Sequence, residues 1–313
     1  MGALAVVVAR AESTARVDLS FHAHPSVWLV MGALAAFFWW ATTRLRARLD
    51  APALTGRQRG WLAAGCLSLW IFAEWPIHDV AERYLFMVHM IQHTVFTLIA
   101  PACLLLGTPP WLYRWILGHR PIAVLARFFG KPIVALVIFN TLIAVTHWPK
   151  LVERGLHSEW IHFSIHMVLF AAALCMWFPV INREPGFPRL SIPAKMMYLF
   201  AQSIVPTVPA SFLTFSNRPL YRTYELAPRL LHGFSAISDQ QVAAAIMKVG
   251  AGSLLWGIVG LLFMQWWKES QKGNSGDNRR IAKPRPVVTF AQAQAEFDQS
   301  EPVPEPVGAG RAP

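Results

Sequence analysis

Long apolar segments are the feature that most constrains how this chain can fold. Seven stretches are each long and apolar enough to form a helix that crosses a bilayer, which takes about 20 such residues. In hydrocarbon every backbone N–H and C=O must be bonded within the protein, and a helix does so within one segment. We therefore expect an all-α integral membrane protein, a seven-transmembrane-helix bundle. The predicted spans are Ser26–Thr43, Gly60–His78, Tyr84–Gly107, Pro132–Trp148, Trp160–Ile181, Ala194–Phe215 and Gln241–Trp267.

The composition favours a membrane protein over a soluble one. Only 14% of the 313 residues are charged, whereas soluble globular proteins usually have about 25%. In a soluble protein the net charge of +11 would suggest a nucleic-acid partner. Membrane proteins instead collect Lys and Arg in their cytoplasmic loops, so we expect membrane lipid around the chain and no nucleic acid.

Basic residues alternate between the two sets of loops. The set that includes the C-terminal segment holds eighteen of them between residues 44 and 285: Arg44, Arg46, Arg48, Arg57, Arg59, Arg114, Arg120, Arg127, Lys131, Arg183, Arg189, Lys195, Lys268, Lys272, Arg279, Arg280, Lys283 and Arg285. The other set holds eight: Arg10, Arg16, Arg83, Lys150, Arg154, Arg218, Arg222 and Arg229. The positive-inside rule then predicts a multi-pass protein of the bacterial inner membrane with its N-terminus outside and its C-terminus cytoplasmic.

Three parts are expected along the chain. Residues 1–25 form an outer N-terminal segment, and residues 26–267 form the transmembrane domain. From about Lys268 the composition shifts to Gln, Pro, Lys and Asn, which bury too little apolar surface to offset the entropy of ordering. We predict a disordered cytoplasmic tail over 268–313, in which Val287–Phe297 has the composition of a short helix.

The histidines are concentrated on one side of the predicted topology. Ten of the eleven lie on or near the outer face: His22, His24, His78, His89, His93, His147, His157, His162, His166 and His232. Only His119 is cytoplasmic. A general preference of histidine for both membrane interfaces is less consistent with this split than a function on the outer side.

Two histidine pairs have the spacing of ligands on a helix. His89 and His93 are four residues apart on the third span, and His162 and His166 on the fifth. Residues i and i+4 share one helix face, and both pairs lie near the outer ends of their spans, so facing helices would bring four imidazoles together. Imidazole ligates Cu, Zn and Fe, and ionisable groups within a membrane are functional candidates. Hydrogen bonding between helices is the alternative.

Sulfur chemistry adds two indications. Met87, Met90 and Met167 flank the pairs, and thioethers favour Cu(I), although each methionine taken singly is more typical of packing. The three cysteines lie toward the cytoplasmic halves of their spans, away from the histidines. A site without thiolate holds copper less tightly, which suits a protein that passes the metal on.

Several polar residues within the spans need partners. Glu74 precedes His78 by four residues, so its carboxylate is predicted to orient that imidazole or to form a simple ion pair. Asp239 opens the seventh span, where capping is favoured over metal ligation. Lys248 is expected to snorkel outward or to meet a carboxylate such as Glu74. Two prolines predict a kink in the sixth span, Pro206 and Pro209.

The stretch around the first histidine pair resembles a known family. It reads His89-Met-Ile-Gln-His93, followed by Ile99-Ala-Pro-Ala-Cys-Leu-Leu-Leu-Gly-Thr-Pro109. This is similar to the most recognisable part of the CtaG-type (caa3) cytochrome c oxidase assembly factors. Further matches follow in order: His147-Trp-Pro149, His157 with the second pair, and Asp239-Gln240-Gln241 before Ile246-Met247. The resemblance covers about residues 26 to 267 and departs from the family at Lys248, where an aromatic residue is expected.

The resemblance implies a function in the maturation of haem–copper oxidase, without catalysis. The chain would handle or insert Cu(I) for the Cu(B) centre, with oxidase subunit I and an outer-side copper donor protein as partners. On this interpretation the two pairs hold a transient copper ion. The further ligands or relay residues would be His78, His147 and His157, surrounded by Glu74, Asp239 and Met90.

Other classes of protein fit parts of the same pattern. A seven-helix zinc hydrolase would use three histidines, Asp79 and either Ser164 or Ser235, with zinc activating a water. A b-type haem protein would use histidines on facing helices as axial ligands. A di-iron oxidase fits less well, because adjacent His-His pairs are missing. In a purely structural protein the histidines would only bond between helices.

Overall fold

The computed structural model describes residues 17, 18, 20–281 and 289–299. All regular elements in these residues are helical, which confirms the all-α prediction. Five helices are each long and apolar enough to cross a membrane, and the number reaches seven if each of two bent helix pairs is one span. Four basic residues used to predict the orientation lie outside the described residues: Arg10, Arg16, Lys283 and Arg285.

The helices follow the predicted segments with shifted ends. The first half contains α2 (Pro25–Trp40), η1 (Ala41–Leu45), α3 (Arg46–Arg48), α4 (Gly56–Ala73), α5 (Ile77–Arg83), α6 (Phe86–Thr94), η2 (Val95–Ile99), α7 (Ala100–Gly107), α8 (Pro110–Gly118), α9 (Arg120–Phe129) and α10 (Pro132–Thr146). The second half contains α11 (Pro149–Leu156), α12 (Glu159–Ile181), α13 (Ile192–Ile204), α14 (Thr207–Phe215), α15 (Arg222–Leu226), α16 (Ala236–Ala245), η3 (Ile246–Gly250), α17 (Ala251–Ile281) and α18 (Phe290–Gln299). Three of these elements, η1, η2 and η3, are π-helical turns.

Two helix pairs are bent where single spans or loops were expected. α4 and α5 meet at 47°, and α9 and α10 at 79°. The second predicted span continued to His78, but α4 ends at Ala73 and α5 begins at Ile77. Pro76 stands between them, and proline has no N–H with which to continue a helix. The bend changes which acidic side chain faces the histidines.

The sixth predicted span is interrupted at Pro206, as its prolines predicted. Lys248 reaches this break from η3: its Nζ donates to the Ser203 carbonyl at 3.2 Å and to Thr207 Oγ1 at 2.5 Å. The last carbonyls of a helix lack donors within the helix. Lys248 therefore caps the end of α13, and neither snorkels outward nor meets a carboxylate as the sequence had suggested.

The main core lies where α6, α10, α12 and α16 come together. Phe86, Leu169, Met176 and Trp177 are almost completely buried in it. The Trp177 indole donates to the carbonyl of Thr97 in η2 at 3.1 Å. This bond links α12 to the π-helical turn that follows the first histidine pair.

α4 and α7 approach each other very closely. A Cβ on Gly107 would lie 2.7 Å from the backbone nitrogen of Leu62, and one on Gly65 would lie 2.9 Å from the Leu104 side chain. Small residues permit such backbone contact in membrane bundles, where lipid supplies no hydrophobic force between helices. Glycine is therefore required at 107, because the neighbouring atom belongs to the backbone.

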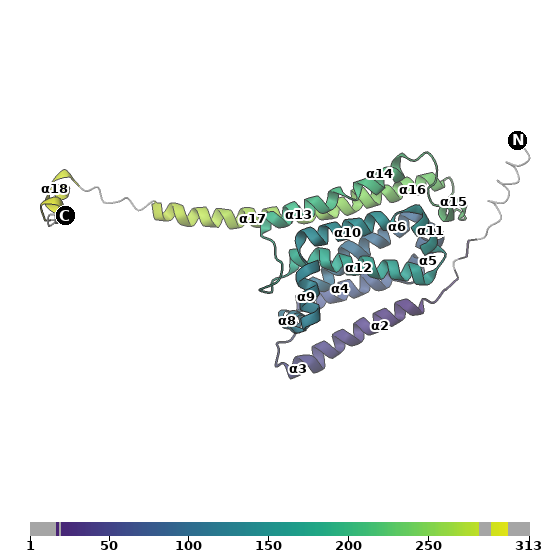
Figure 1. The fold of residues 1–313 in the computed structure, drawn as a ribbon, viewed down its shortest axis with the longest axis horizontal. Helices are drawn as coiled ribbons and strands as arrows, with labels where there is room; N and C mark the ends of the chain where they lie inside the picture. Colours follow the sequence, from purple (N-terminus) through teal and green to yellow (C-terminus); the bar gives the residue numbers. More distant parts are fainter. Residues whose placement is uncertain (1–16, 19, 282–288, 300–313) are drawn as a thin grey trace, which may run out of the picture. The chain divides into compact units, whose positions relative to one another are not determined.

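The helix ends predicted to face outside meet at one end of the bundle. α6 contacts both α5 and α16, and α11 contacts both α12 and α15. Figure 1 shows α5, α11 and α15 at this end, with α3, α8 and α9 at the other. Helices that alternate in direction produce this arrangement. Most of the histidines predicted to be on the outer side therefore lie at this end of the bundle.

The C-terminal part contains more helix than the sequence suggested. Residues 265–313 form a unit of their own, separate from the unit of residues 1–264. α17 continues to Ile281, past the start of the predicted tail at Lys268, and α18 (Phe290–Gln299) overlaps the short helix expected over Val287–Phe297. Extending a formed helix needs no new nucleus, and no proline occurs between Ala251 and Ile281. The remaining residues of the predicted tail lie outside the described ranges.

Candidate metal centre

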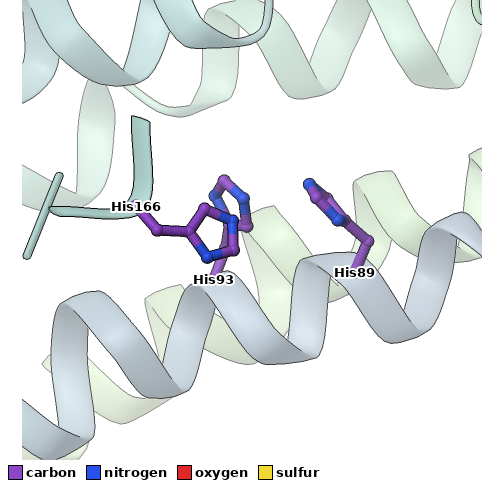
Figure 2. A group of neighbouring side chains, drawn as sticks. All are labelled: His89, His93 and His166. Atoms are coloured by element: carbon purple, nitrogen blue, oxygen red, sulfur yellow. The ribbon is translucent and has the colours of Figure 1, made fainter. Parts of the chain in front are cut away.

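Three histidines form a group that could hold a metal ion. His89 and His93 come from α6 and His166 from α12, and one ring nitrogen from each lies within 4.8 Å of the others. Figure 2 shows the three rings in the space between the two helices. The facing arrangement expected from the two histidine pairs is thus present in the fold.

His162 joins the group through His166. Their Nε2 atoms are 2.8 Å apart, and the ring centroids of His162 and His89 are separated by 5.5 Å. Both members of each pair therefore face the same space, as expected from i, i+4 spacing on a helix.

Asp239 fixes the start of the helix that carries the first pair. Its carboxylate accepts the backbone N–H of Phe86 at 2.7 Å and of Met87 at 2.9 Å. The first N–H groups of a helix lack internal acceptors, and negative charge is favoured there. Capping was expected at the N-terminus of the seventh span itself. Asp239 instead caps α6 from α16 and is not placed as a metal ligand.

Glu82 takes the place that the sequence suggested for Glu74. One Glu82 oxygen lies 3.1 Å from His78 Nε2 and also contacts His162 Nδ1. The Glu74 carboxylate instead accepts the Trp28 indole N–H at 2.6 Å. The correction follows from the bend between α4 and α5, which turns Glu74 away and puts Glu82 one turn after His78. Glu82 follows His78 by four residues, and this spacing could have identified Glu82 from the sequence.

His78 is held on its second nitrogen as well. The Gln92 side-chain nitrogen lies 2.8 Å from His78 Nδ1 and donates to the Phe72 carbonyl at 2.6 Å. Gln92 is completely buried on α6, between the two histidines of the first pair in sequence. The His78 ring is consequently positioned by α5 and α6 together and lies 5.8 Å from the His162 ring.

His147 and His157 have different positions although both were predicted as ligands or relay residues. The buried His147 ring lies 5.8 Å from the His93 ring. His157 is exposed at the end of α11, where its Nδ1 bonds the Glu153 carbonyl at 2.6 Å. The fold therefore brings His147 to the cluster and leaves His157 outside it.

Several imidazole nitrogens of the cluster are buried without a hydrogen-bond partner among the described residues. They are His89 Nδ1, both ring nitrogens of His93, and His147 Nε2. Leaving buried polar atoms unbonded is costly, and native proteins rarely do so. A neutral imidazole has one lone pair, so a bound cation would satisfy one nitrogen on each ring, and the donor set fits a metal that prefers imidazole.

The N-terminal segment approaches the cluster on its His78 side. His22 and His24 approach the buried Asp79 carboxylate at 3.8 and 3.6 Å, and Arg83 approaches it at 3.4 Å. The His24 ring also lies 4.6 Å from the His78 ring. His24 and Asp79 thus connect the N-terminal segment to the cluster through His78.

A cavity of about 360 Å³ borders the cluster on its His162 side. Apolar side chains of α2, α4 and α12 line most of it, and His78, Glu82, His162 and His166 lie at its polar part. From this cavity, the nearest imidazoles of the cluster include those of His78 and His162, which contact Glu82.

The serine and aspartate residues that a zinc hydrolase would need make other contacts in this fold. Ser164 Oγ donates to the Trp160 carbonyl at 2.7 Å, and Ser235 caps the start of α16. Asp79 contacts the N-terminal histidines described above. The free cysteines, Cys66, Cys103 and Cys175, are not among the groups that could hold a metal in the described residues.

The methionines near the pairs divide between the core and the large cavity. Met90 is buried in the main core, with Met87 packed against it. Met167 lines the cavity of about 360 Å³. Met90 was expected near the site, and it faces a second, smaller cavity beside His93.

Comparison with known proteins identifies relatives of the transmembrane region. The model of the family described as cytochrome c oxidase caa3 assembly factor (Caa3_CtaG) matches residues 36–269. The uncharacterised proteins Mb0105 of Mycobacterium bovis and MT0111 of Mycobacterium tuberculosis are each 22% identical over 252 residues. These matches cover 72% of this chain but only 36% of each relative. No solved structure matches the chain.

Proposed function

Because this chain belongs to the family of caa3 cytochrome c oxidase assembly factors, we propose that it binds copper and passes it to the Cu(B) centre of oxidase subunit I. Family membership supports a role in oxidase assembly. The copper ion would be a cargo, bound transiently and then released. In this proposal the chain catalyses no reaction.

The observation that carries the proposal is the group of His89, His93 and His166. Their nitrogens lie within 4.8 Å of one another, and three of the nitrogens on the first two rings are buried and unbonded among the described residues. Imidazole is a good ligand for copper, and no thiolate strengthens the site. Such a site binds the ion while leaving it able to move to another set of imidazoles.

His162, His78 and His147 complete the proposed site in two different ways. His162 contacts His166 directly and is oriented by Glu82. Histidine ligands commonly donate their other ring N–H to a carboxylate or a backbone carbonyl, which fixes the tautomer. His78 lies next to His162 and His147 next to His93, so these two are the proposed relay residues. His157 is exposed outside the cluster and is left out of the proposed site.

The proposed topology places this site near the outer face. Seven spans with the N-terminus outside would put eighteen basic residues in the cytoplasm and eight outside. An outer-side donor protein would then deliver copper to His22 and His24 first. The bacterial inner membrane and the identity of both partners belong to the same proposal.

Metal analysis of the assembled oxidase tests this function. Cells deleted for their own copy of the gene would be complemented with wild type, with His89→Ala/His93→Ala, or with His119→Ala as a matched control. His119 is exposed and lies between α8 and α9, at the other end of the bundle (Figure 1). We expect Cu(B) content per haem to fall only in the double variant. Normal Cu(B) content in that variant would contradict the proposal.

A further inference from the structure

A second, smaller cavity lies beside His93. It has a volume of about 60 Å³, and its lining includes two imidazoles and three thioethers among mostly apolar and small side chains: His93, His147, Met90, Met176 and Met247. The described residues that line it include no Asp, Glu, Lys or Arg side chain. The cavity is large enough for one ion and offers ligands that are unlike those of the carboxylate-bound histidines.

His147, which lines this cavity, has an unshared lone pair. Its Nδ1 is 2.6 Å from the Ile143 carbonyl oxygen, and a carbonyl oxygen only accepts hydrogen bonds. The proton is therefore on Nδ1, which leaves Nε2 as the acceptor, and Nε2 is buried without a hydrogen-bond partner. Imidazoles that ligate metals are typically held in this way by a backbone carbonyl.

The three methionines converge from separate parts of the chain. Met90 belongs to α6, Met176 to α12 and Met247 to η3, and their exposed fractions are only 3%, 0% and 8%. Two π-helical turns, η2 and η3, contribute to the same cavity wall. π-helical turns occur frequently at functional sites, because they redirect side chains within a helix.

We propose that this cavity is a second Cu(I) site, with His147 Nε2 and the sulfur atoms of Met90, Met176 and Met247 as ligands and His93 shared with the first site. This inference rests on the proposed copper-handling function and adds a place for the ion to move to. Soft thioether ligands select Cu(I) over Zn(II) and Fe(II). A cavity without charged side chains also favours a monovalent cation over a divalent one, because the desolvation cost is smaller. Copper remains Cu(I) throughout, so no electron is transferred.

Copper X-ray absorption of the intact protein tests the second site. The full chain in lipid nanodiscs would receive one and then two equivalents of Cu(I) without oxygen. We expect nitrogen ligands alone at one equivalent and added sulfur scattering at two. Absence of sulfur scattering from the wild type at two equivalents overturns the inference.

Methionine variants assign the sulfur signal. The triple variant Met90→Leu/Met176→Leu/Met247→Leu keeps side-chain volume nearly constant, and we expect it to bind one fewer Cu(I) and to lose the sulfur signal. Met197→Leu is the matched control, because Met197 is 68% exposed. Sulfur scattering that persists in a folded triple variant overturns the inference.

A second variant does not depend on repacking the core. His147→Ala retains all three methionines, and we expect its affinity for the second Cu(I) to fall by about 100-fold, because a ligand itself is lost. An unchanged second affinity counts against the site. By contrast, His89→Ala/His166→Ala should lose the nitrogen-only ion and keep the sulfur-bound ion. If that variant binds both ions normally, the first site and the proposed function fail while the methionine site stands.

Discussion

The two halves of the histidine cluster satisfy their polar atoms differently. In the half around Glu82, His78 and His162 both contact one carboxylate oxygen, and Gln92 holds His78 from the other side. In the half around His93, both ring nitrogens are buried without a hydrogen-bond partner in the described part of the chain.

This difference indicates separate tasks within one cluster. In the Glu82 half both ring nitrogens of His78 and of His162 have polar contacts without an ion, although Gln92 Oε1 is buried without a partner among the described residues. The His93 half leaves lone pairs unpaired at a cost that a cation removes. In the proposed copper-handling function, the first half would orient and receive the ion, and the second half would bind it.

Removing an imidazole from the unsatisfied half should have the largest effect. We expect His93→Ala to lower Cu(I) affinity by at least about 100-fold, more than the usual effect of losing a supporting residue. Equilibrium competition with a colorimetric Cu(I) chelator measures this. His157→Ala is the control, because His157 is exposed and outside the cluster. Equal affinities for the two variants would remove the distinction between binding and peripheral histidines.

Altering the carboxylate of the satisfied half should have a smaller effect. Glu82→Gln keeps the shape but weakens the orientation of His78 and His162, so we expect an approximately tenfold loss of Cu(I) affinity. The same competition assay applies. A loss as large as that of His93→Ala would mean that Glu82 itself binds the ion.

The cap on α6 should affect stability more than ligand chemistry. Asp239→Ala removes both hydrogen bonds to Phe86 and Met87, and we expect the free energy of unfolding to fall by about 1–2 kcal/mol. Thermal melting in nanodiscs detects this. Asp239→Asn retains one acceptor oxygen and should lose less. Melting temperatures equal to wild type in both variants would show that the cap is not needed.

The smallest effect is expected at the acidic residue that the bend turns away. Glu74→Gln retains an acceptor for the Trp28 indole, so we expect Cu(I) affinity within about twofold of wild type and a stability loss below about 1 kcal/mol. Comparison with Glu82→Gln in the same preparation is the measurement. A tenfold affinity loss would restore Glu74 as the partner of His78.

The sequence was sufficient for those features that depend on local periodicity. Bilayer thickness sets the length of the spans, and the helical repeat puts His89 with His93 and His162 with His166 on common faces. These two regularities predicted the helical class and the meeting of the two pairs. The break at Pro206 followed equally from local chemistry, because proline lacks a backbone donor.

The remaining features depend on contacts between distant segments. Asp239 caps a helix that begins 153 residues earlier, and no local pattern connects the two. Glu82 lies four residues after His78, a spacing typical of contacts within a helix. Its contact with the histidines also depends on the bend between α4 and α5, which was not predicted. Met176 carries no signal in the sequence, and Met247 enters only through the family resemblance, since buried methionine is usual in a core.

Anaerobic titration of the purified full-length chain with Cu(I), under chelator competition, tests the central claim most directly. The wild type should retain copper against the chelator, and His89→Ala/His93→Ala should lose at least one equivalent and about 100-fold in affinity while remaining folded. Equal copper binding by the wild type and the double variant would contradict the account, as would no binding by the wild type.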